Sequence, residues 1–209
     1  MKLLFATFNP AKLREAGEIL GDGFELLSPE DAGLTREEAE VEETGTTFRE
    51  NSLLKAERLH ALTGMDCFAD DSGLEVDALG GAPGIYSARY AALVGGKDHD
   101  FASNIDRLLY ELRDCRDRRA RFRCVVTLIS GGETRFFEGT CEGRIAFGRS
   151  GNGGFGYDPV FIPDVFPDMT LAEVGEDAKN AISHRGKALA QMQAFLKGKA
   201  LPGQPGSGC

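Results

Sequence analysis

The residues with the clearest chemical potential are Asp70-Asp71-Ser72-Gly73, which follow a short apolar run at residues 67–69. A carboxylate at the end of a strand in an α/β fold lies where ligands usually bind, and it can ligate Mg²⁺ or accept a proton from water. Because successive strand residues face opposite sides, we expect one aspartate to face the ligand and the other the scaffold. Asp, Ser and Gly also favour plain turns, so this segment alone leaves a metal site and an acidic turn equally open.

A possible phosphate-binding turn is Thr7-Phe8-Asn9-Pro10-Ala11-Lys12. Asn9 is a favourable N-cap and Pro10 a favourable first helical residue. The free N–H groups of a helix start, together with Lys12 in its first turn, can bind phosphate. The glycines of a Walker loop are missing, and an ordinary capped helix is the simpler interpretation of this segment alone.

Two further groups can contribute to a site. Glu42-Glu43-Thr44-Gly45 precedes a predicted helix that carries Lys55 on its polar face, so a glutamate could complete a metal site while Lys55 reaches phosphates. The second group is the glycine-rich segment 153–159 with Lys179 and Ser183-His184-Arg185. Its aromatic residues can stack on a base, and His184 and Arg185 can donate hydrogen bonds to a purine oxo group. Taken separately, a solvated acidic loop and a tight turn before a basic helix explain the same residues.

The apolar pattern predicts the elements that must position these residues. A strand at 3–7, a helix at 11–20 and a strand at 24–27 form a β-α-β unit, which favours parallel strands. Residues 28–43 are expected to be irregular, and Ser130-Gly131-Gly132-Glu133 predicts a hairpin turn. The other predicted strands are 67–69, 74–79, 122–129, 134–145 and 159–162, and the other predicted helices are 46–62, 98–113 and 181–197.

The composition suits one α/β domain of two lobes over residues 1–200, with a Gly- and Pro-rich tail at 201–209 that we expect to be disordered. A net charge of −9 argues against partners such as nucleic acid or an anionic membrane. The five cysteines lack metal-binding spacing, which favours reduced thiols in a cytosolic protein. The six arginines within 113–123 are interrupted by aspartates and are expected to belong to a solvated helix end. Cys67, among apolar neighbours, is expected to pack in the core.

Six blocks of residues follow one another along the chain. They are Thr7-x-Asn9-x-x-Lys12, then EETG at 42–45 with Phe48, Glu50, Asn51 and Lys55, then DDSGL at 70–74, GGAPGIYSAR at 80–89, GFGYDP at 154–159 and Ser183-His184-Arg185. In this order they closely resemble the inosine triphosphate pyrophosphatase family (Ham1-like proteins, XTP/dITP diphosphatases). The resemblance runs from the first strand to the last helix, although many members carry glycine where this chain has Phe8 and Ala11.

The resemblance implies an elongated α/β fold with a mixed central sheet flanked by helices, and two lobes around a substrate cleft. It implies a homodimer and Mg²⁺-dependent hydrolysis of XTP, dITP and ITP to the monophosphate and pyrophosphate, which cleanses the nucleotide pool. Asp71 is implied as general base and metal ligand, Glu42 as a further metal ligand, and Asp70 as a supporting residue. The implied substrate contacts are Thr7, Phe8, Asn9, Pro10, Ala11, Lys12 and Lys55 for the triphosphate, Ser72, and Phe155, Gly156, Tyr157, Asp158, Lys179, His184 and Arg185 for the base.

Two other functions are considered. A Maf-like nucleotide pyrophosphatase would share the fold and act on other nucleotides, but the His184-Arg185 pair and the 154–159 loop favour the inosine triphosphate pyrophosphatase family. A non-hydrolytic nucleotide sensor would not need both Glu42 and Asp71, so their presence favours an enzyme.

Overall fold

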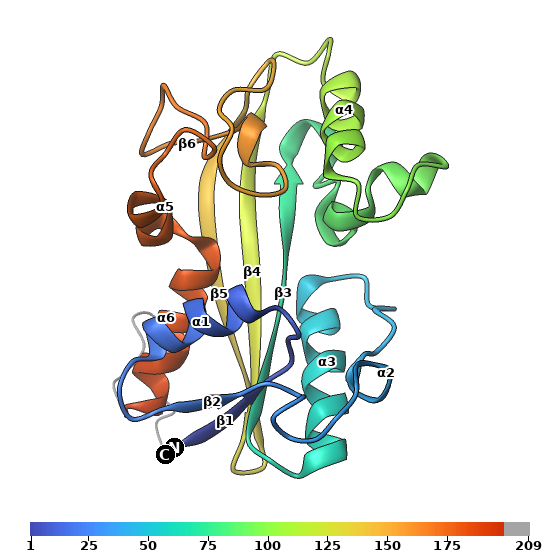
Figure 1. The fold of residues 1–209 in the computed structure, drawn as a ribbon. Coiled ribbons are helices and arrows are strands. Elements are labelled where there is room, and N and C mark those ends of the chain that lie inside the picture. The colour runs from blue at the N-terminus through green and yellow to red at the C-terminus, as the bar shows by residue number, and fades with distance from the viewer. Residues whose placement is uncertain (199–209) are drawn as a thin grey trace, which may run out of the picture.

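A long antiparallel hairpin of strands β4 (Arg119–Ser130) and β5 (Glu133–Ile145) forms the axis of the molecule (Figure 1). The computed structural model describes residues 1–198, so the expected tail at 201–209 lies outside the described residues. Gly131 and Gly132 connect the strands with φ angles of 59° and 80°, a conformation that suits glycine in a two-residue hairpin turn. The hairpin predicted from the sequence is confirmed, and it starts earlier than expected because Arg119 already pairs with β5.

The hairpin belongs to a six-stranded mixed sheet with the order β2-β1-β3-β4-β5-β6. Strands β1 (Lys2–Phe5), β2 (Glu25–Leu27) and β3 (Cys67–Val76) are parallel to one another in adjacent pairs. Strand β3 is antiparallel to β4, and β6 (Phe161–Pro163) is antiparallel to β5. Helix α1 (Pro10–Leu20) connects β1 to β2, so the predicted parallel β-α-β unit is confirmed.

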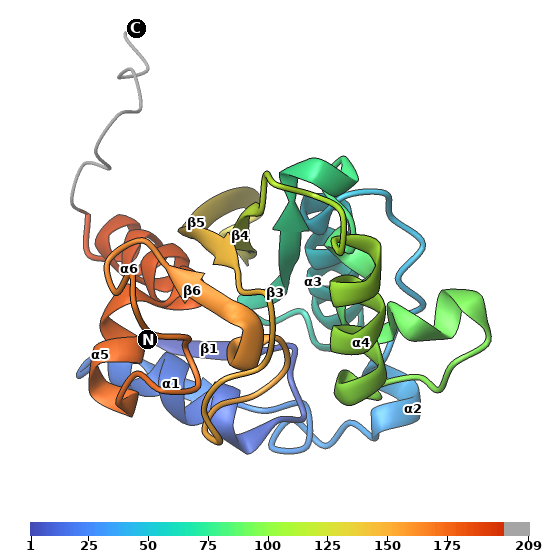
Figure 2. The same ribbon diagram turned by 90° about the horizontal axis from the view of Figure 1, so that it is seen from above.

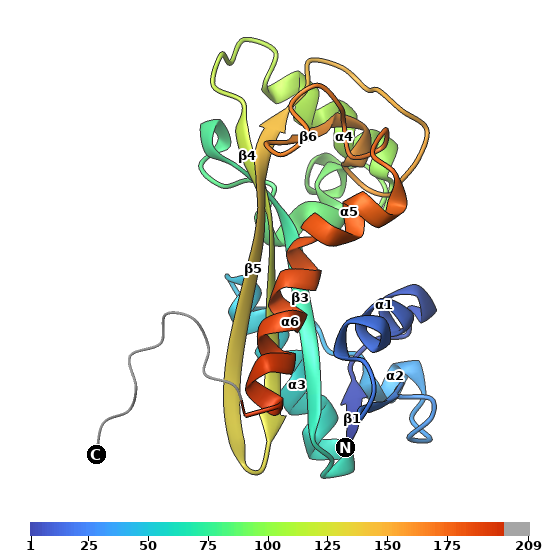
Figure 3. The same ribbon diagram turned by 90° about the vertical axis from the view of Figure 1, so that its left-hand side faces the viewer.

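Helices cover both faces of the lower part of the sheet. Helix α3 (Phe48–Thr63) packs on one face, while α1 and α6 (His184–Leu196) pack on the other (Figures 1 and 3). Strand alternation separates two apolar clusters, with Phe5 and Phe68 stacked at 4.3 Å on the α1–α6 side and Leu4 and Leu59 on the α3 side. Each fully buried Leu or Phe of this kind stabilises the fold by about 1.5–3 kcal/mol.

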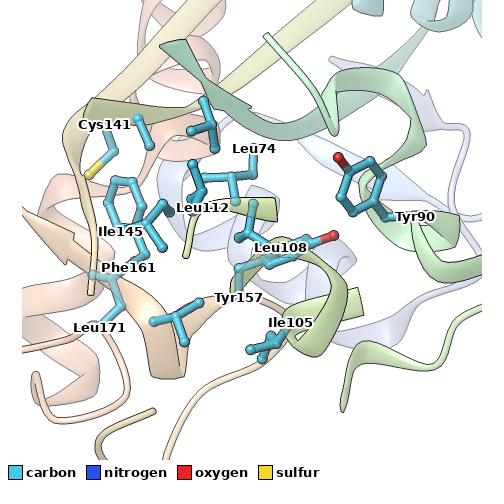
Figure 4. Packing of buried hydrophobic residues seen from close by; sticks show 13 residues of the cluster. Leu74, Tyr90, Ile105, Leu108, Leu112, Cys141, Ile145, Tyr157, Phe161 and Leu171 are labelled. Carbon is cyan, nitrogen blue, oxygen red and sulfur yellow. The ribbon is translucent and has the colours of Figure 1, made fainter. Parts of the chain in front are cut away.

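The upper part of the molecule has its own core around the ends of β3, β4 and β5. Leu74, Tyr90, Leu108, Tyr157 and Phe161 meet there (Figure 4). Helix α4 (Phe101–Glu111) supplies one wall of this core, and α5 (Glu176–Ile182) leads back to α6. The remaining short helices are α2 (Arg36–Ala39), η1 (Asp77–Leu79), η2 (Gly84–Arg89), η3 (Ala91–Val94) and η4 (Asp158–Val160).

Four predictions of secondary structure are wrong. The arginines within 113–123 do not form a solvated helix end, because Arg119, Arg121 and Arg123 lie in β4 and Arg118 is buried. The acidic turn does not exist, because Asp70-Asp71-Ser72-Gly73 lies inside β3, which pairs with β4 along all ten of its residues. The single helix expected at 181–197 is two helices, since Ser183 leaves the helical path and its Oγ accepts from Gly186 N at 3.2 Å to cap α6. The segment expected to be irregular holds α2. Within residues 1–198, no helix has the length and apolar character needed to cross a membrane.

Candidate active site

Asp70 and Asp71 lie on opposite faces of β3. Alternation along the strand directs Asp70 toward α1 and α6, where it bonds side chains of both helices. Asp71 points toward α3, where it bonds Lys55. The two carboxylates therefore do not share a proton, as the alternation of strand residues predicted.

The Asp71 carboxylate is held through one of its two oxygens. Lys55 Nζ lies 3.1 Å from Asp71 Oδ1 and 2.9 Å from Glu43 Oε1. Asp71 Oδ2 is buried and has no hydrogen-bond partner among the described residues. Burial raises the pKa of Asp71, and the Lys55 ammonium offsets this only in part. A buried carboxylate oxygen in this state is suited to ligate a cation or to accept a proton from water.

The Lys55 ammonium is held in position by the carboxylates of Asp71 and Glu43. Burial opposes its charge, but the carboxylates of Asp71 and Glu43 outweigh burial and raise the pKa of Lys55. Arg89 of η2 approaches the same acidic group, with Nη2 3.7 Å from Glu43 Oε2. Two cations from different elements thus surround the carboxylates, which is the charge pattern that suits a triphosphate bound with a metal ion.

The acidic loop before α3 is anchored by Asn51. This residue is fully buried, and its Oδ1 accepts a hydrogen bond from Gly45 N at 2.8 Å. A Cβ at position 45 would lie 2.6 Å from that oxygen, so the position requires glycine. The loop turns Glu43 inward and leaves Glu42 exposed. The structure therefore places Glu43 near Asp71, whereas the resemblance pointed to Glu42.

The donors on this face suit Mg²⁺. Asp71 provides a buried oxygen without a hydrogen-bond partner within residues 1–198, and Glu43 provides a second carboxylate nearby. In the part of the chain that the structure describes, no group of three His, Cys, Asp or Glu side chains could hold a metal alone. Mg²⁺ is usually bound by one or two carboxylates together with substrate phosphates, so the residues present fit this ion.

The buried Asp70 carboxylate joins three elements through a partly buried ionic network. Lys12 Nζ lies 3.0 Å from Asp70 Oδ1, and Arg185 Nε lies 2.9 Å from Asp70 Oδ2. Arg185 also bonds Glu15 on α1, with 3.0 Å between Nη1 and Oε2. Burial alone would raise the pKa of Asp70, but Lys12 and Arg185 outweigh it and hold that pKa far below its usual value. Asp70 is thus ionised and holds together two cations that the sequence assigned to the substrate.

The predicted phosphate turn is an open helix start. Asn9 Oδ1 accepts from Ala11 N at 2.9 Å, and Thr7 Oγ1 accepts from Asn9 N at 3.1 Å. The Phe8 ring lies 4.5 Å from the guanidinium carbon of Arg36 in a cation–π contact. This cap confirms the predicted N-terminus of α1. The exposed residues at the turn are Asn9, Pro10 and Ala11.

The loop at 154–158 is built around the buried Asp158. Asp158 Oδ2 accepts from Phe155 N at 2.7 Å and also from Lys179 Nζ. Gly154 has a φ of 78°, and a Cβ there would lie 2.8 Å from Asp158 Cβ, so this turn requires glycine. Gly156 also has a positive φ of 64°. The tight turn leaves the Phe155 side chain turned outward, and the residue is 72% exposed.

Tyr157 is buried, unlike Phe155 in the same loop. It is 2% exposed and lies in the upper core, where its hydroxyl donates to Ser87 O at 2.9 Å (Figure 4). Of the two aromatic residues that the sequence suggested for base stacking, Phe155 is the one whose ring is open to a ligand.

His184 and Ser72 lie near the Asp70 network. The His184 ring stacks on Phe122, with 5.1 Å between centroids and 14° between planes. Burial lowers the pKa of His184 to about 3, and the neighbouring Arg185 guanidinium adds to the effect. The imidazole is therefore neutral at neutral pH. Ser72 is half-buried and, by alternation, lies on the same face of β3 as Asp70.

Sequence reasoning missed Glu15 and the inward position of Glu43. The spacing of Lys12 and Glu15 places both on one face of α1, so helical periodicity could have identified Glu15 as a partner of a nearby cation. Nothing in two adjacent glutamates indicates which of them turns inward, because the loop anchor decides it.

Known proteins resemble this chain over nearly its whole length. The model of the Ham1 family matches residues 3–195. A dITP/XTP pyrophosphatase of Christiangramia forsetii is 44% identical over 94% of this chain and 99% of its own length. A dITP/XTP pyrophosphatase of Porphyromonas gingivalis is 47% identical over 93% of this chain and 97% of its own length. The solved Ham1 protein of Staphylococcus aureus is 40% identical, with a TM-score of 0.85 over 95% of this chain and 99% of its own. This chain belongs to the Ham1 family.

Proposed function

We propose that this protein is a pyrophosphatase that hydrolyses nucleoside triphosphates carrying non-standard purines, namely dITP, XTP and ITP, to the monophosphate and pyrophosphate. In the cell this reaction removes such nucleotides from the pool. The observation that carries the proposal is the Asp71 carboxylate, with one oxygen on Lys55 and the other buried without a hydrogen-bond partner among the described residues. The similar proteins of Christiangramia forsetii and Porphyromonas gingivalis are dITP/XTP pyrophosphatases, which supports the substrate class.

Asp71 is the proposed general base. Its raised pKa makes it a better proton acceptor than an ordinary aspartate, and Lys55 fixes its orientation. Water loses its proton to Asp71 as it attacks the α-phosphorus, and pyrophosphate leaves. Asp71 and Glu43 would hold Mg²⁺, with Glu42 as the alternative carboxylate that the resemblance implied. When bound, Mg²⁺ supplies charge neutralisation for the triphosphate and its leaving group.

The triphosphate is proposed to lie between the start of α1 and Lys55. The exposed cap at Asn9, Pro10 and Ala11 presents the helix N-terminus, and Lys12 stands in its first turn. These groups are fixed before substrate arrives, because Lys12 is paired with Asp70 and Lys55 with Asp71. Most of the rate enhancement then comes from positioning and electrostatics.

The base pocket is proposed at the loop 154–158 and the start of α6. The ring of Phe155 stacks on the purine, while His184 and Arg185 donate hydrogen bonds to its 6-oxo group. Adenine presents an amino donor at that position, and a polar pocket rejects such a mismatch far better than an apolar pocket does. Lys179 and Asp158 hold the loop, and Ser72 contacts the substrate from β3.

The experiment that tests this function is a panel of ITP, dITP, XTP, GTP and ATP with Mg²⁺, in which pyrophosphate and orthophosphate are detected separately. We expect pyrophosphate as the first product, with ITP, dITP and XTP as the preferred substrates. Orthophosphate as the first product, or equal rates on ATP, would overturn the proposal. Preference for other nucleotides would indicate a Maf-like activity, and binding without turnover would indicate a sensor.

We also propose that the protein works as a homodimer in the cytoplasm. The family resemblance supports the dimer, and the four free cysteines within residues 1–198 suit a reducing compartment. Sedimentation equilibrium tests the dimer, which predicts a mass of twice 22.5 kDa.

A further inference from the structure

The exposed ring of Phe155 rests against an aromatic residue from a distant part of the chain. Phe101, the first residue of α4, lies with its ring centroid 4.7 Å from that of Phe155 and at an interplanar angle of 65°. This is the edge-to-face arrangement that aromatic pairs prefer. Phe155 is nevertheless 72% exposed, so the contact supports the ring without covering most of it.

A second contact ties α4 to the same stretch of chain. Arg149 Nη1 lies 2.8 Å from Asp106 Oδ1, and Arg149 Nη2 donates to Ala102 O at 2.8 Å. The Phe101 ring also lies close to the loop backbone, since a Cβ added at Gly156 would be 3.6 Å from it. Figure 2 shows α4 alongside the segment that leads from β5 to β6. Helix α4 therefore supports this segment at two points, through Arg149 and through Phe101.

Helix α4 is itself firmly anchored. Asn104 is fully buried, its Oδ1 accepts from Ala91 N at 2.6 Å, and its Nδ2 donates to Ala88 O at 3.0 Å. Asp100 caps the helix through Ser103, with 2.7 Å between Ser103 Oγ and Asp100 Oδ2. The apolar face of α4 packs into the upper core (Figure 4). Phe101 thus projects from a rigid element, whereas Phe155 projects from a loop.

We propose that Phe101 is a positioning residue for base recognition, which holds the Phe155 ring so that its open face can stack on the purine. An unsupported exposed phenylalanine samples several rotamers, and stacking would have to select one of them. The edge-to-face contact selects that rotamer before the nucleotide binds, which lowers the entropy lost on binding. This inference rests on the base pocket of the proposed function.

The test measures KM and kcat for ITP in Phe101→Leu, with Phe101→Met as a second variant and Phe101→Tyr as the conservative one. An aromatic pair contributes enough to change affinity about two- to tenfold, so we expect KM to rise by that factor in the Leu and Met variants. The kcat value should stay within about twofold, because a stacking contact acts on ground state and transition state alike. Phe101→Tyr should retain the original KM.

Tyr110→Leu is the matched control, because Tyr110 is an exposed aromatic residue of the same helix whose ring contacts Arg113. It should leave KM unchanged. A purely structural role for Phe101 would lower the thermal midpoint without changing KM, and that result would overturn the inference.

Phe155→Leu separates failure of the inference from failure of the base pocket. If Phe155→Leu raises KM and Phe101→Leu does not, the inference is wrong and the pocket stands. If Phe155→Leu leaves KM unchanged, the assignment of the pocket is wrong and the inference falls with it. If the inference is right, the double variant Phe101→Leu/Phe155→Leu is no worse than Phe155→Leu alone.

Discussion

The ammonium nitrogen of Lys55 lies 3.1 Å from Oδ1 of Asp71, while Oδ2 of the same carboxylate is buried without a hydrogen-bond partner in residues 1–198. One oxygen fixes the orientation of the side chain and the other is left for a metal ion or a water. Burial raises the pKa of this carboxyl, so it can accept a proton more readily than a solvent-exposed aspartate.

Replacing Asp71 by Asn should abolish turnover and preserve the fold. The amide keeps the size of the side chain and can still accept from Lys55, but it can no longer take a proton. We expect kcat for ITP to fall by about 100-fold or more, with a small change in the thermal midpoint. Pyrophosphate release and a melting curve on the same sample measure both. Near-normal activity would remove Asp71 from the mechanism.

Glu43 should contribute more than Glu42 to Mg²⁺ binding. Glu43 shares Lys55 with Asp71, whereas Glu42 is exposed. Glu43→Gln should raise the Mg²⁺ concentration needed for half-maximal rate and reduce the shift in melting temperature that Mg²⁺ produces. Glu42→Gln is the matched control and should change both values less. The reverse order would assign the metal to Glu42, as the resemblance implied.

Arg185→Ala should lower kcat/KM for ITP more than kcat/KM for ATP. A hydrogen bond from a charged donor contributes about 1.5–3 kcal/mol, so kcat/KM for ITP should fall about tenfold or more. The fold also loses stability, because Asp70 retains only Lys12 of its two bonded cations. The ratio of kcat/KM for ITP and ATP is independent of how much enzyme is folded. An equal loss on both nucleotides would show that Arg185 does not read the base.

Gly73→Ala should destabilise the fold. A Cβ at this position would overlap the carbonyl oxygen of Gly84 and lie 2.5 Å from Ser87 Oγ. Overpacking of this kind costs about 1–3 kcal/mol, and the melting temperature should fall accordingly. Gly17→Ala is the control. Gly17 lies in α1, and a Cβ added there would meet no atom within 4 Å, so this variant should stabilise the fold by about 0.5–1 kcal/mol. Equal melting temperatures for the two variants would contradict the packing argument.

His184 should stay neutral throughout the physiological range. Its pKa is lowered to about 3 in the folded protein, below the value of about 6.5 for an unfolded chain. The unfolded state therefore binds more protons between these values, so this residue makes stability fall as the pH drops from about 6.5 toward 3. Imidazole NMR signals should show no titration of His184 between pH 5 and 8. A midpoint within that range would contradict the neutral state of this half-buried imidazole.

Local features of the sequence predicted much of the fold. Asn9 and Pro10 identify the start of α1, and Ser130-Gly131-Gly132-Glu133 identifies the hairpin, because caps and tight turns depend on a few adjacent residues. The prediction of an acidic turn at 70–73 was wrong because a contact with a distant part of the chain decides the structure there. Its residues favour turns locally, but pairing with β4 on one side extends the strand through them.

The candidate active site likewise has features that the sequence predicts and features that only the tertiary structure decides. The order of the six blocks determined the family and the set of residues that could do chemistry, because residue type and spacing are properties of the sequence. The tertiary structure alone decided which helices the two aspartates meet, that Glu43 rather than Glu42 turns inward, and that Tyr157 is buried while Phe155 is open. Such choices depend on which elements pack against each face of β3 and which distant groups anchor each loop, and no local pattern encodes those contacts.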